Sequence, residues 1–211
     1  MAQYLEALSK SVIEGDMTGV TAGVQAALDT GIEAGEILQA GLIPAMGEVG
    51  RLFEGGEYYV PEMLVAARAM KAGLEIIRPL LVQSEIKPAG KVVVGTVKGD
   101  LHDIGKNLVA MMLEGAGFEI QDLGTDVGPD EFVAALKEDS VDLVGLSALL
   151  TTTMPMMKST IRAITEAGLR DQVKIIVGGA PVTPGYAEEI GADGYAPDAS
   201  RAVSLARQLI G

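Results

Sequence analysis

The chain contains no cysteine, no tryptophan and a single histidine among its 211 residues. The absence of cysteine excludes disulfide bonds and thiolate metal sites. One histidine cannot build a protein zinc site, which needs at least three protein ligands. Aromatic residues make up 4% of the chain and hydrophobic residues 48%, so alanine, glycine, valine, leucine and methionine must fill the core. Such packing is typical of helical bundles and of sheets covered by helices.

Basic residues are also scarce. Lysine and arginine number 16 against 29 aspartates and glutamates, which gives a net charge of −13. This charge argues against nucleic acid and anionic membranes as partners, because both would be repelled. No apolar run reaches the roughly 18 residues that a membrane span needs. The first residues, MAQYLEALSK, lack the basic-then-apolar pattern of a signal peptide. We therefore expect a cytoplasmic protein.

Residues 1–85 show helical periodicity and no strand-like alternation. A fourth helix is predicted from about Pro61 to Leu81, because proline fits the first turn of a helix. Short connections between the segments favour a small antiparallel bundle, the predicted N-terminal helical cap domain. The first three segments are marked by Leu5, Leu8 and Val12, by Val20, Val24 and Leu28, and by Ile37, Ile43, Met46, Val49 and Phe53.

Residues 86–90, with a proline and a glycine, form a predicted linker, after which the pattern changes. Short apolar runs alternate with helical segments, which predicts a parallel sheet covered on both faces over residues 91–211. We expect an α + α/β protein with a five-stranded doubly wound sheet, Rossmann- or flavodoxin-like, in the order 2-1-3-4-5. The predicted strands are 91–96, 118–123, 143–147, 174–177 and 194–196; the predicted helices are 105–115, 129–137, 154–167, 185–190 and 199–209.

The loop after the first predicted strand carries the chain's one histidine, His102. A P-loop is excluded because five residues separate Gly99 from Gly105 and because Asn107 replaces the hydroxyl residue; the GxGxxG fingerprint is absent as well. A lone histidine can still complete a metal whose other positions are filled by a macrocycle, as for cobalt in a corrin. Asp100 could accept the proton of the other ring nitrogen and orient the imidazole.

The segment Asp100-x-His102-x-x-Gly105 resembles the DxHxxG motif of base-off/His-on cobalamin-binding domains. In this chain 41 residues lead from that motif to Ser147-x-Leu149, and 28 more lead to Gly178-Gly179, as in that family. Residues 52–63, LFEGGEYYVPEM, resemble the helical cap of methionine synthase's cobalamin module. As a whole, the chain is similar to the free-standing corrinoid proteins of methylamine, methanol, betaine and aryl-ether methyl transfer.

The resemblance implies a lower face of the cofactor built by the first loop. His102 would be the axial cobalt ligand, Asp100 its hydrogen-bond partner, and Thr153 a relay hydroxyl where methionine synthase has serine. Asp103 and Lys106 are expected to be solvated groups at a helix start rather than chemical groups. The remaining residues of the first motif expected to contact the cofactor are Gly99, Asp103, Ile104 and Gly105.

The resemblance also implies a tail pocket and a lid. Ser147 would hold the displaced benzimidazole of the cofactor, and the two glycines would leave room for the nucleotide tail. An apolar lid from the helical region would shield the methyl–cobalt bond, hinged at Gly55-Gly56 and at the linker. Thr151 is expected close to the corrin. The other residues expected on this side are Ser147, Leu149, Gly178, Gly179 and Ala199, and the expected lid residues are Phe53, Val60 and Met63.

The function implied is that of a methyl-carrier subunit rather than a stand-alone enzyme, with no catalytic acid or base of its own. Its cofactor would be cobalamin or a related corrinoid with its cobalt, as methylcobalamin when loaded. Its partners would be a substrate-specific methyltransferase, a methylcorrinoid:tetrahydrofolate or coenzyme M methyltransferase, and a reductive activase. The alternatives are a cobalamin-dependent sensor, which would carry a basic DNA-binding segment, and a mutase small subunit, which would bind adenosylcobalamin.

Overall fold

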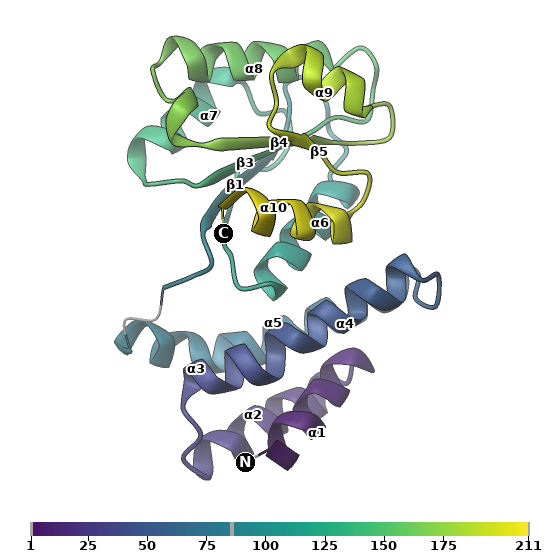
Figure 1. Cartoon of the computed structure of the whole chain (residues 1–211), viewed down its shortest axis with the longest axis vertical. Helices are drawn as coiled ribbons and strands as arrows, with labels where there is room; N and C mark the ends of the chain where they lie inside the picture. The colour runs from purple at the N-terminus through teal and green to yellow at the C-terminus, as the bar shows by residue number, and fades with distance from the viewer. Residues whose placement is uncertain (1, 85–86, 211) are drawn as a thin grey trace. The chain divides into compact units, whose positions relative to one another are not determined.

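The structure, a computed structural model, describes residues 2–84 and 87–210, and is shown in Figure 1. It divides into two compact units. One comprises Met1–Pro88 with Glu114–Gly117, and the other comprises Ala89–Leu113 with Phe118–Gly211. Of the predicted linker 86–90, Ile86 lies outside the described residues. Within the part of the chain that the structure describes, none of the helices is long and apolar enough to span a membrane.

The first unit is built of helices, as predicted, and α2 and α5 pack against each other along their lengths. The third predicted segment is divided: a π-helical stretch precedes Pro44, which lacks the N–H that a regular helix would use. Ser9 Oγ donates to the carbonyl of Gly41 in that stretch, at 2.7 Å. The elements are α1 (Ala2–Ile13), α2 (Met17–Asp29), α3 (Ala34–Glu36), η1 (Ile37–Leu42), α4 (Ile43–Glu54) and α5 (Val60–Gln83).

The second unit contains a five-stranded parallel sheet in the order β2-β1-β3-β4-β5, which confirms the prediction. The central strands are buried on both faces, which is why they appear in the sequence as continuous apolar runs rather than as alternating ones. The strands are β1 (Lys91–Thr96), β2 (Glu119–Asp122), β3 (Leu143–Ser147), β4 (Lys174–Gly178) and β5 (Gly194–Tyr195).

Helices cover both faces of this sheet. In Figure 1, α7, α8 and α9 lie on one face and α6 and α10 on the other. Phe132 of α7 is fully buried in the core between the strands and helices α7, α8 and α9. The helices are α6 (Ile104–Gly115), α7 (Pro129–Glu138), α8 (Pro155–Glu166), α9 (Pro184–Ile190) and α10 (Ala199–Ile210), with a short 3-10 helix, η2 (Arg170–Gln172).

The strand order fixes where a site can form. In a parallel sheet all carboxyl ends lie at one edge, and ligands bind at this edge where the strand order reverses. Here the reversal falls between β1 and β3, which are paired from Val92↔Leu143 to Thr96↔Ser147. The loops that follow Thr96 and Ser147 therefore begin side by side, and these loops carry His102 and Thr153.

Candidate cofactor site

The loop between β1 and α6 presents the imidazole of His102. The loop turns at Gly99, whose φ of 83° lies in the left-handed region that favours glycine. Thr96 Oγ1 donates to the carbonyl of His102 at 2.9 Å, and the side chain of His102 remains 51% exposed. Its Nδ1 lies 2.6 Å from Asp100 Oδ1. A neutral imidazole that donates its Nδ1 proton to a carboxylate keeps the lone pair of Nε2, the nitrogen that a metal can take.

The carboxylate of Asp100 is fully buried and accepts hydrogen bonds at both oxygens. Oδ1 accepts from the backbone N–H of His102 at 3.1 Å as well as from its ring. Oδ2 accepts from the N–H groups of Leu149 and Leu150, at 2.8 and 3.2 Å, and from Thr153 Oγ1 at 2.6 Å. Burial by itself raises the pKa of Asp100, but the bonds from Thr153, His102 and Leu149 outweigh it and hold the pKa far below its usual range. Asp100 is therefore a fixed anionic acceptor beneath the imidazole.

Thr153 completes a chain of three groups, from hydroxyl to carboxylate to imidazole. Its Oγ1 also lies 2.9 Å from the carbonyl of Leu150, so the single hydroxyl proton has two acceptors within reach. The residue is buried, which keeps competing water away from both bonds. The arrangement can hold a proton at Thr153 Oγ1 or pass its hydrogen bond from one acceptor to the other.

Exposed apolar side chains surround His102. Leu101 and Ile104 are 73% and 77% exposed, and Leu149 and Leu150, in the adjoining loop, are 42% and 41% exposed. Large apolar side chains held in water beside a half-exposed imidazole fit the flat, largely apolar face of a macrocycle. Leu101 and Leu150 were not among the residues predicted for the site. Both are apolar residues inside polar loops, which is the pattern that could have revealed them.

Gly105 supports the same fit. A Cβ built on this residue would have no neighbouring atom within 4 Å, so no contact inside the chain accounts for a glycine there. Asp103, directly before α6, is exposed and accepts from Asn107 Nδ2 at 3.0 Å. Among the described residues, no group of three or more His, Cys, Asp or Glu side chains could hold a metal ion.

The prediction that Lys106 is a solvated group is wrong. Its side chain is 3% exposed, and its ammonium group pairs with the carboxylate of Asp122 at the end of β2. It also donates to Asn107 Oδ1 at 2.6 Å. The lysine therefore fastens the first turn of α6 to the neighbouring strand, because a buried ammonium group must have an anionic or hydrogen-bonding partner.

The predicted tail-side residues lie at the carboxyl edge of the sheet. Ser147 ends β3, and its carbonyl accepts from Val97 N–H at 3.0 Å. Gly179 has a φ of 129°, and a Cβ on it would lie 1.9 Å from the carbonyl oxygen of Ala148. This approach of two backbones accounts for Gly179 by itself, whereas contact with a nucleotide tail stays a prediction. Thr151 is exposed and Ala199, the first residue of α10, is buried.

The predicted lid residues lie in the helical unit, at the end of α4 and the start of α5. Phe53 is half-buried, Val60 is 38% exposed and Met63 is fully buried. The loop between them is tied to α1, because Tyr58 Oη donates to the carbonyl of Ile13 at 3.1 Å. Their role toward a cofactor stays a prediction.

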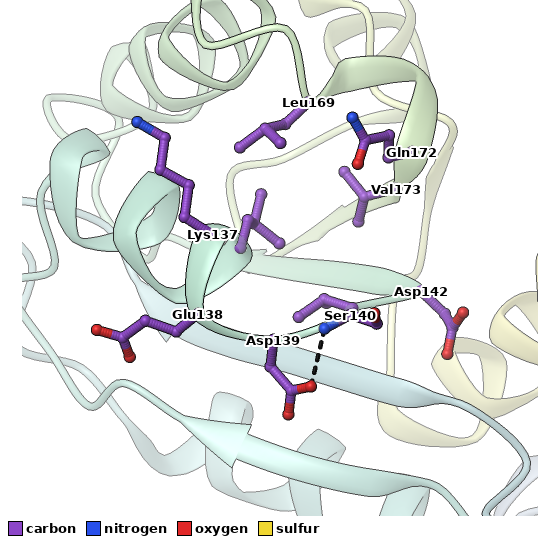
Figure 2. Close-up of a pocket in the computed structure, with 10 residues that line it drawn as sticks. Lys137, Glu138, Asp139, Ser140, Asp142, Leu169, Gln172 and Val173 are labelled. Carbon is purple, nitrogen blue, oxygen red and sulfur yellow. Dashed lines mark hydrogen bonds between the residues drawn. The ribbon is translucent and has the colours of Figure 1, made fainter.

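One cleft lies away from these residues. It has a volume of about 480 Å³ and is lined by residues 136–142 with Leu169, Gln172 and Val173 (Figure 2). These residues stand before β3 and β4, at the amino edge of the sheet, whereas His102 follows the carboxyl end of β1. The cleft holds none of the predicted site residues.

Two family profiles match the chain. One described as a B12 binding domain matches residues 90–204, and a second of the same description matches residues 4–78. The fold, the loop of His102 and these matches together define the class as that of B12-binding domains with a helical region.

Similar proteins narrow this class. Dimethylamine corrinoid protein 1 of Methanosarcina acetivorans is 44% identical over 209 residues, covering 99% of this chain and 98% of that protein. A corrinoid protein of Desulfitobacterium hafniense is 42% identical over 98% of this chain and 97% of its own length. The chain belongs to the family of corrinoid proteins of methyltransferase systems, whose cofactor is cobalamin or a related cobalt corrinoid.

Solved structures of similar proteins support the same family. The crystal structure of the methanol:cobalamin methyltransferase complex from Methanosarcina barkeri matches with a TM-score of 0.88 and 30% identity, covering 99% of this chain and 80% of that chain. A cobalamin-binding protein from Desulfitobacterium hafniense matches with a TM-score of 0.82 and 32% identity, covering 98% of each chain.

We expect Thr153→Val to lower the free energy of unfolding of the cofactor-free protein by about 1.5–3 kcal/mol, because the ionised Asp100 loses a charge-assisted hydrogen bond. Thr153→Ser keeps the hydroxyl and should cost less than about 1 kcal/mol. Urea unfolding of the three proteins measures both differences. Equal stabilities for the valine variant and the parent protein would contradict the role assigned to this bond.

Proposed function

We propose that the protein binds a corrinoid through His102 Nε2 and carries a methyl group on the cobalt between two methyltransferases. The observation that carries this proposal is the half-exposed imidazole whose Nδ1 is held, at 2.6 Å, by a fully buried carboxylate. The bound corrinoid supplies the nucleophilic cobalt centre that takes up and releases the methyl group. The task left to the chain is to hold, orient and shield that cofactor.

The loop that follows β1 would contact the lower face of the cofactor. Asp100 fixes the tautomer and the direction of the ring, and Thr153 holds a proton against the carboxylate. Exposed Leu101 and Ile104 exclude water beneath the macrocycle once it is bound. Five hydrogen bonds from the chain itself hold Asp100, so the direction of the imidazole would be set by the protein rather than by the cofactor.

We assign the cofactor's nucleotide tail to the loops after β3, β4 and β5. Their common position at the carboxyl edge of the sheet supports the assignment, since this is the edge where parallel sheets bind ligands. Ser147 would accept or donate to the displaced base. The remaining members of this proposed subsite are Leu149, Thr151, Gly178, Gly179 and Ala199.

We assign the lid of the cofactor to residues 1–85 and the binding domain to residues 91–211, with residues 86–90 as the linker. The match of a B12-binding profile to residues 4–78, outside the sheet unit, supports a cofactor-related role for the helices. Exposed Val60 and half-buried Phe53 would shield the methyl group, with Met63 packed behind them. Gly55-Gly56 and the linker would then serve as the hinges when a partner enzyme approaches.

The partners in this proposal are three enzymes. A substrate-specific methyltransferase loads the methyl group, a methylcorrinoid:tetrahydrofolate or coenzyme M methyltransferase removes it, and a reductive activase restores cobalt that has been oxidised. The names of the relatives support the first partner, because they include dimethylamine corrinoid proteins and a methanol methyltransferase complex. The proposal keeps the expectation of a cytoplasmic protein, since tetrahydrofolate and coenzyme M are intracellular carriers.

The ligand assignment has a direct spectroscopic test, because His102 is the only histidine of the chain. Protein labelled with ¹⁵N-histidine and loaded with unlabelled Co(II) cobalamin should show a doublet superhyperfine splitting from its axial nitrogen, where unlabelled protein shows a triplet. His102→Ala should lose the histidine splitting altogether. A triplet that persists in the labelled protein would mean that the axial base belongs to the cofactor.

The carrier role is tested by transfer of a radiolabelled methyl group. Cobalamin-loaded, reduced protein incubated with a methylamine or methanol methyltransferase and its labelled substrate should retain the label, and His102→Ala should retain far less. A subsequent methyl acceptor enzyme should remove it. If the protein retains no label with any such enzyme but binds adenosylcobalamin tightly, a mutase subunit is favoured. If it retains no label and does not bind adenosylcobalamin tightly, a sensor is favoured.

The lid is tested with methylcobalamin bound to the protein. Phe53→Ala should increase the rate of photolysis about two- to tenfold, because a smaller side chain leaves space through which the methyl radical escapes. Val82→Ala, at a residue 75% exposed near the end of α5, is the control and should leave the rate unchanged. Equal photolysis rates for Phe53→Ala and the parent protein would remove Phe53 from the lid.

A further inference from the structure

Asp126 lies in the loop between β2 and α7 and contacts the loop of His102 at three points. Its Oδ1 accepts from the N–H of Gly99 at 2.8 Å, and its own N–H donates to the carbonyl of Asp100 at 2.9 Å. Its Oδ2 lies 3.1 Å from Lys98 Nζ. The bond from Gly99 is the main cause that holds the pKa of Asp126 below its usual value, ahead of Lys98. Asp126 is thus an anionic partner of the backbone at Gly99, one residue before Asp100 and three residues before His102.

The backbone of Asp126 is unusual. Its φ of 58° lies in the left-handed region, and among residues 2–84 and 87–210 it is the one non-glycine residue there. Aspartate and asparagine adopt this conformation more readily than other residues, although at a cost in free energy. The conformation lets the N–H and the carboxylate of one residue reach both Gly99 and Asp100. Backbone strain that the surrounding structure maintains is a feature of functional sites.

The contacts extend the sheet beyond its strands. After β1 ends at Thr96, the N–H of Thr96 donates to Gly124, and the N–H of Val127 donates back to Thr96, both at 2.9 Å. Val97 and Val127 form an isolated parallel bridge. Asp126 directly precedes this bridge, and its carboxylate accepts from the N–H of Gly99 in the loop that follows Val97.

The other attachments of the loop hold groups around this stretch, and within it the N–H of Asp100 donates to the carbonyl of Val97 at 3.1 Å. Leu149, Leu150 and Thr153 hold the side chain of Asp100, and Thr96 holds the carbonyl of His102. Asp126 holds the backbone between Gly99 and Asp100, at the point where the left-handed turn of Gly99 directs the chain toward the imidazole.

We propose that Asp126 is a positioning residue for the cobalt ligand, which sets the direction of His102 by clamping the Gly99–Asp100 backbone. This inference rests on the proposed function of His102 as axial ligand. The hydrogen bond to Gly99, rather than the ion pair, carries the effect. Lys98 and Asp126 are 53% and 44% exposed, and pairs so open to solvent contribute little.

The test separates strain from hydrogen bonding. Asp126→Gly tolerates the left-handed backbone and keeps the N–H to Asp100, so it removes the carboxylate alone. Asp126→Asn keeps an acceptor oxygen and the backbone preference, while Lys98→Met removes the ion pair. Asp142→Ala is the matched control, because Asp142 Oδ2 accepts from Lys91 N–H at 2.7 Å at the other end of β1. Should Asp126→Gly not fold, Asp126→Ser, with a side chain too short to reach Gly99, replaces it.

Each variant is loaded with Co(II) cobalamin, and three quantities are measured: the fraction of cobalt with the histidine splitting, the cobalamin affinity, and amide exchange at Gly99 in the cofactor-free protein. We expect Asp126→Gly to exchange faster at Gly99, to lose part of the histidine splitting and to bind cobalamin about tenfold more weakly, as for other groups that orient metal ligands. Asp126→Asn, Lys98→Met and Asp142→Ala should keep the full splitting and bind within about threefold of the parent protein.

A full histidine splitting and unchanged affinity in Asp126→Gly, with Gly99 exchanging faster, would overturn the inference and leave the proposed function intact. An equal loss of splitting in Asp142→Ala would overturn it too, since the effect would then follow general destabilisation. Absence of the histidine splitting from the parent protein would instead refute the ligand assignment on which the inference rests.

Discussion

A buried carboxylate organises the site. An ionised carboxylate inside a protein is costly unless its oxygens are fully hydrogen-bonded, and Asp100 has no exposed surface. Its donors come from two loops: His102 in its own, and Leu149, Leu150 and Thr153 in the loop after β3. The charge therefore draws the two loops together, and the same bonds that stabilise it direct the imidazole outward.

The sheet makes this convergence possible. β1 and β3 are neighbours only because the strand order reverses between them, so the loops after Thr96 and Ser147 start in adjacent positions. Farther along the edge, Gly179 allows the loop after β4 to approach the carbonyl of Ala148. The backbone that donates to Asp100 is thus supported from β4 as well, and the site's rigidity is a property of the edge of the sheet rather than of one loop.

Much of this architecture is visible in the sequence. β1 and β3 have the predicted bounds, because strands buried on both faces are unbroken apolar runs; β5 has only two residues and barely differs from its surroundings. The grouping of Asp100, His102 and Thr153 was expected from the resemblance to cobalamin-binding domains. The burial of Lys106 and the contacts of Asp126 were not predicted. The burial of Lys106 depends on where β2 ends, and the contacts of Asp126 depend on its left-handed backbone. Neither leaves a periodic pattern in the chain.

The threonine at position 153 illustrates how the relay hydroxyl is kept in place. A Cβ added at Gly99 would lie 3.6 Å from Thr153 Cγ2, so the methyl group lies near the turn that leads to His102. A β-branched side chain has few χ1 rotamers, and packing its methyl group selects among them. In the rotamer that the structure adopts, the methyl group lies on the side of Gly99 and Oγ1 donates to Asp100 at 2.6 Å. Threonine therefore supplies the same hydroxyl as serine with fewer rotamers open to it, so the direction of the hydroxyl toward Asp100 is more restricted.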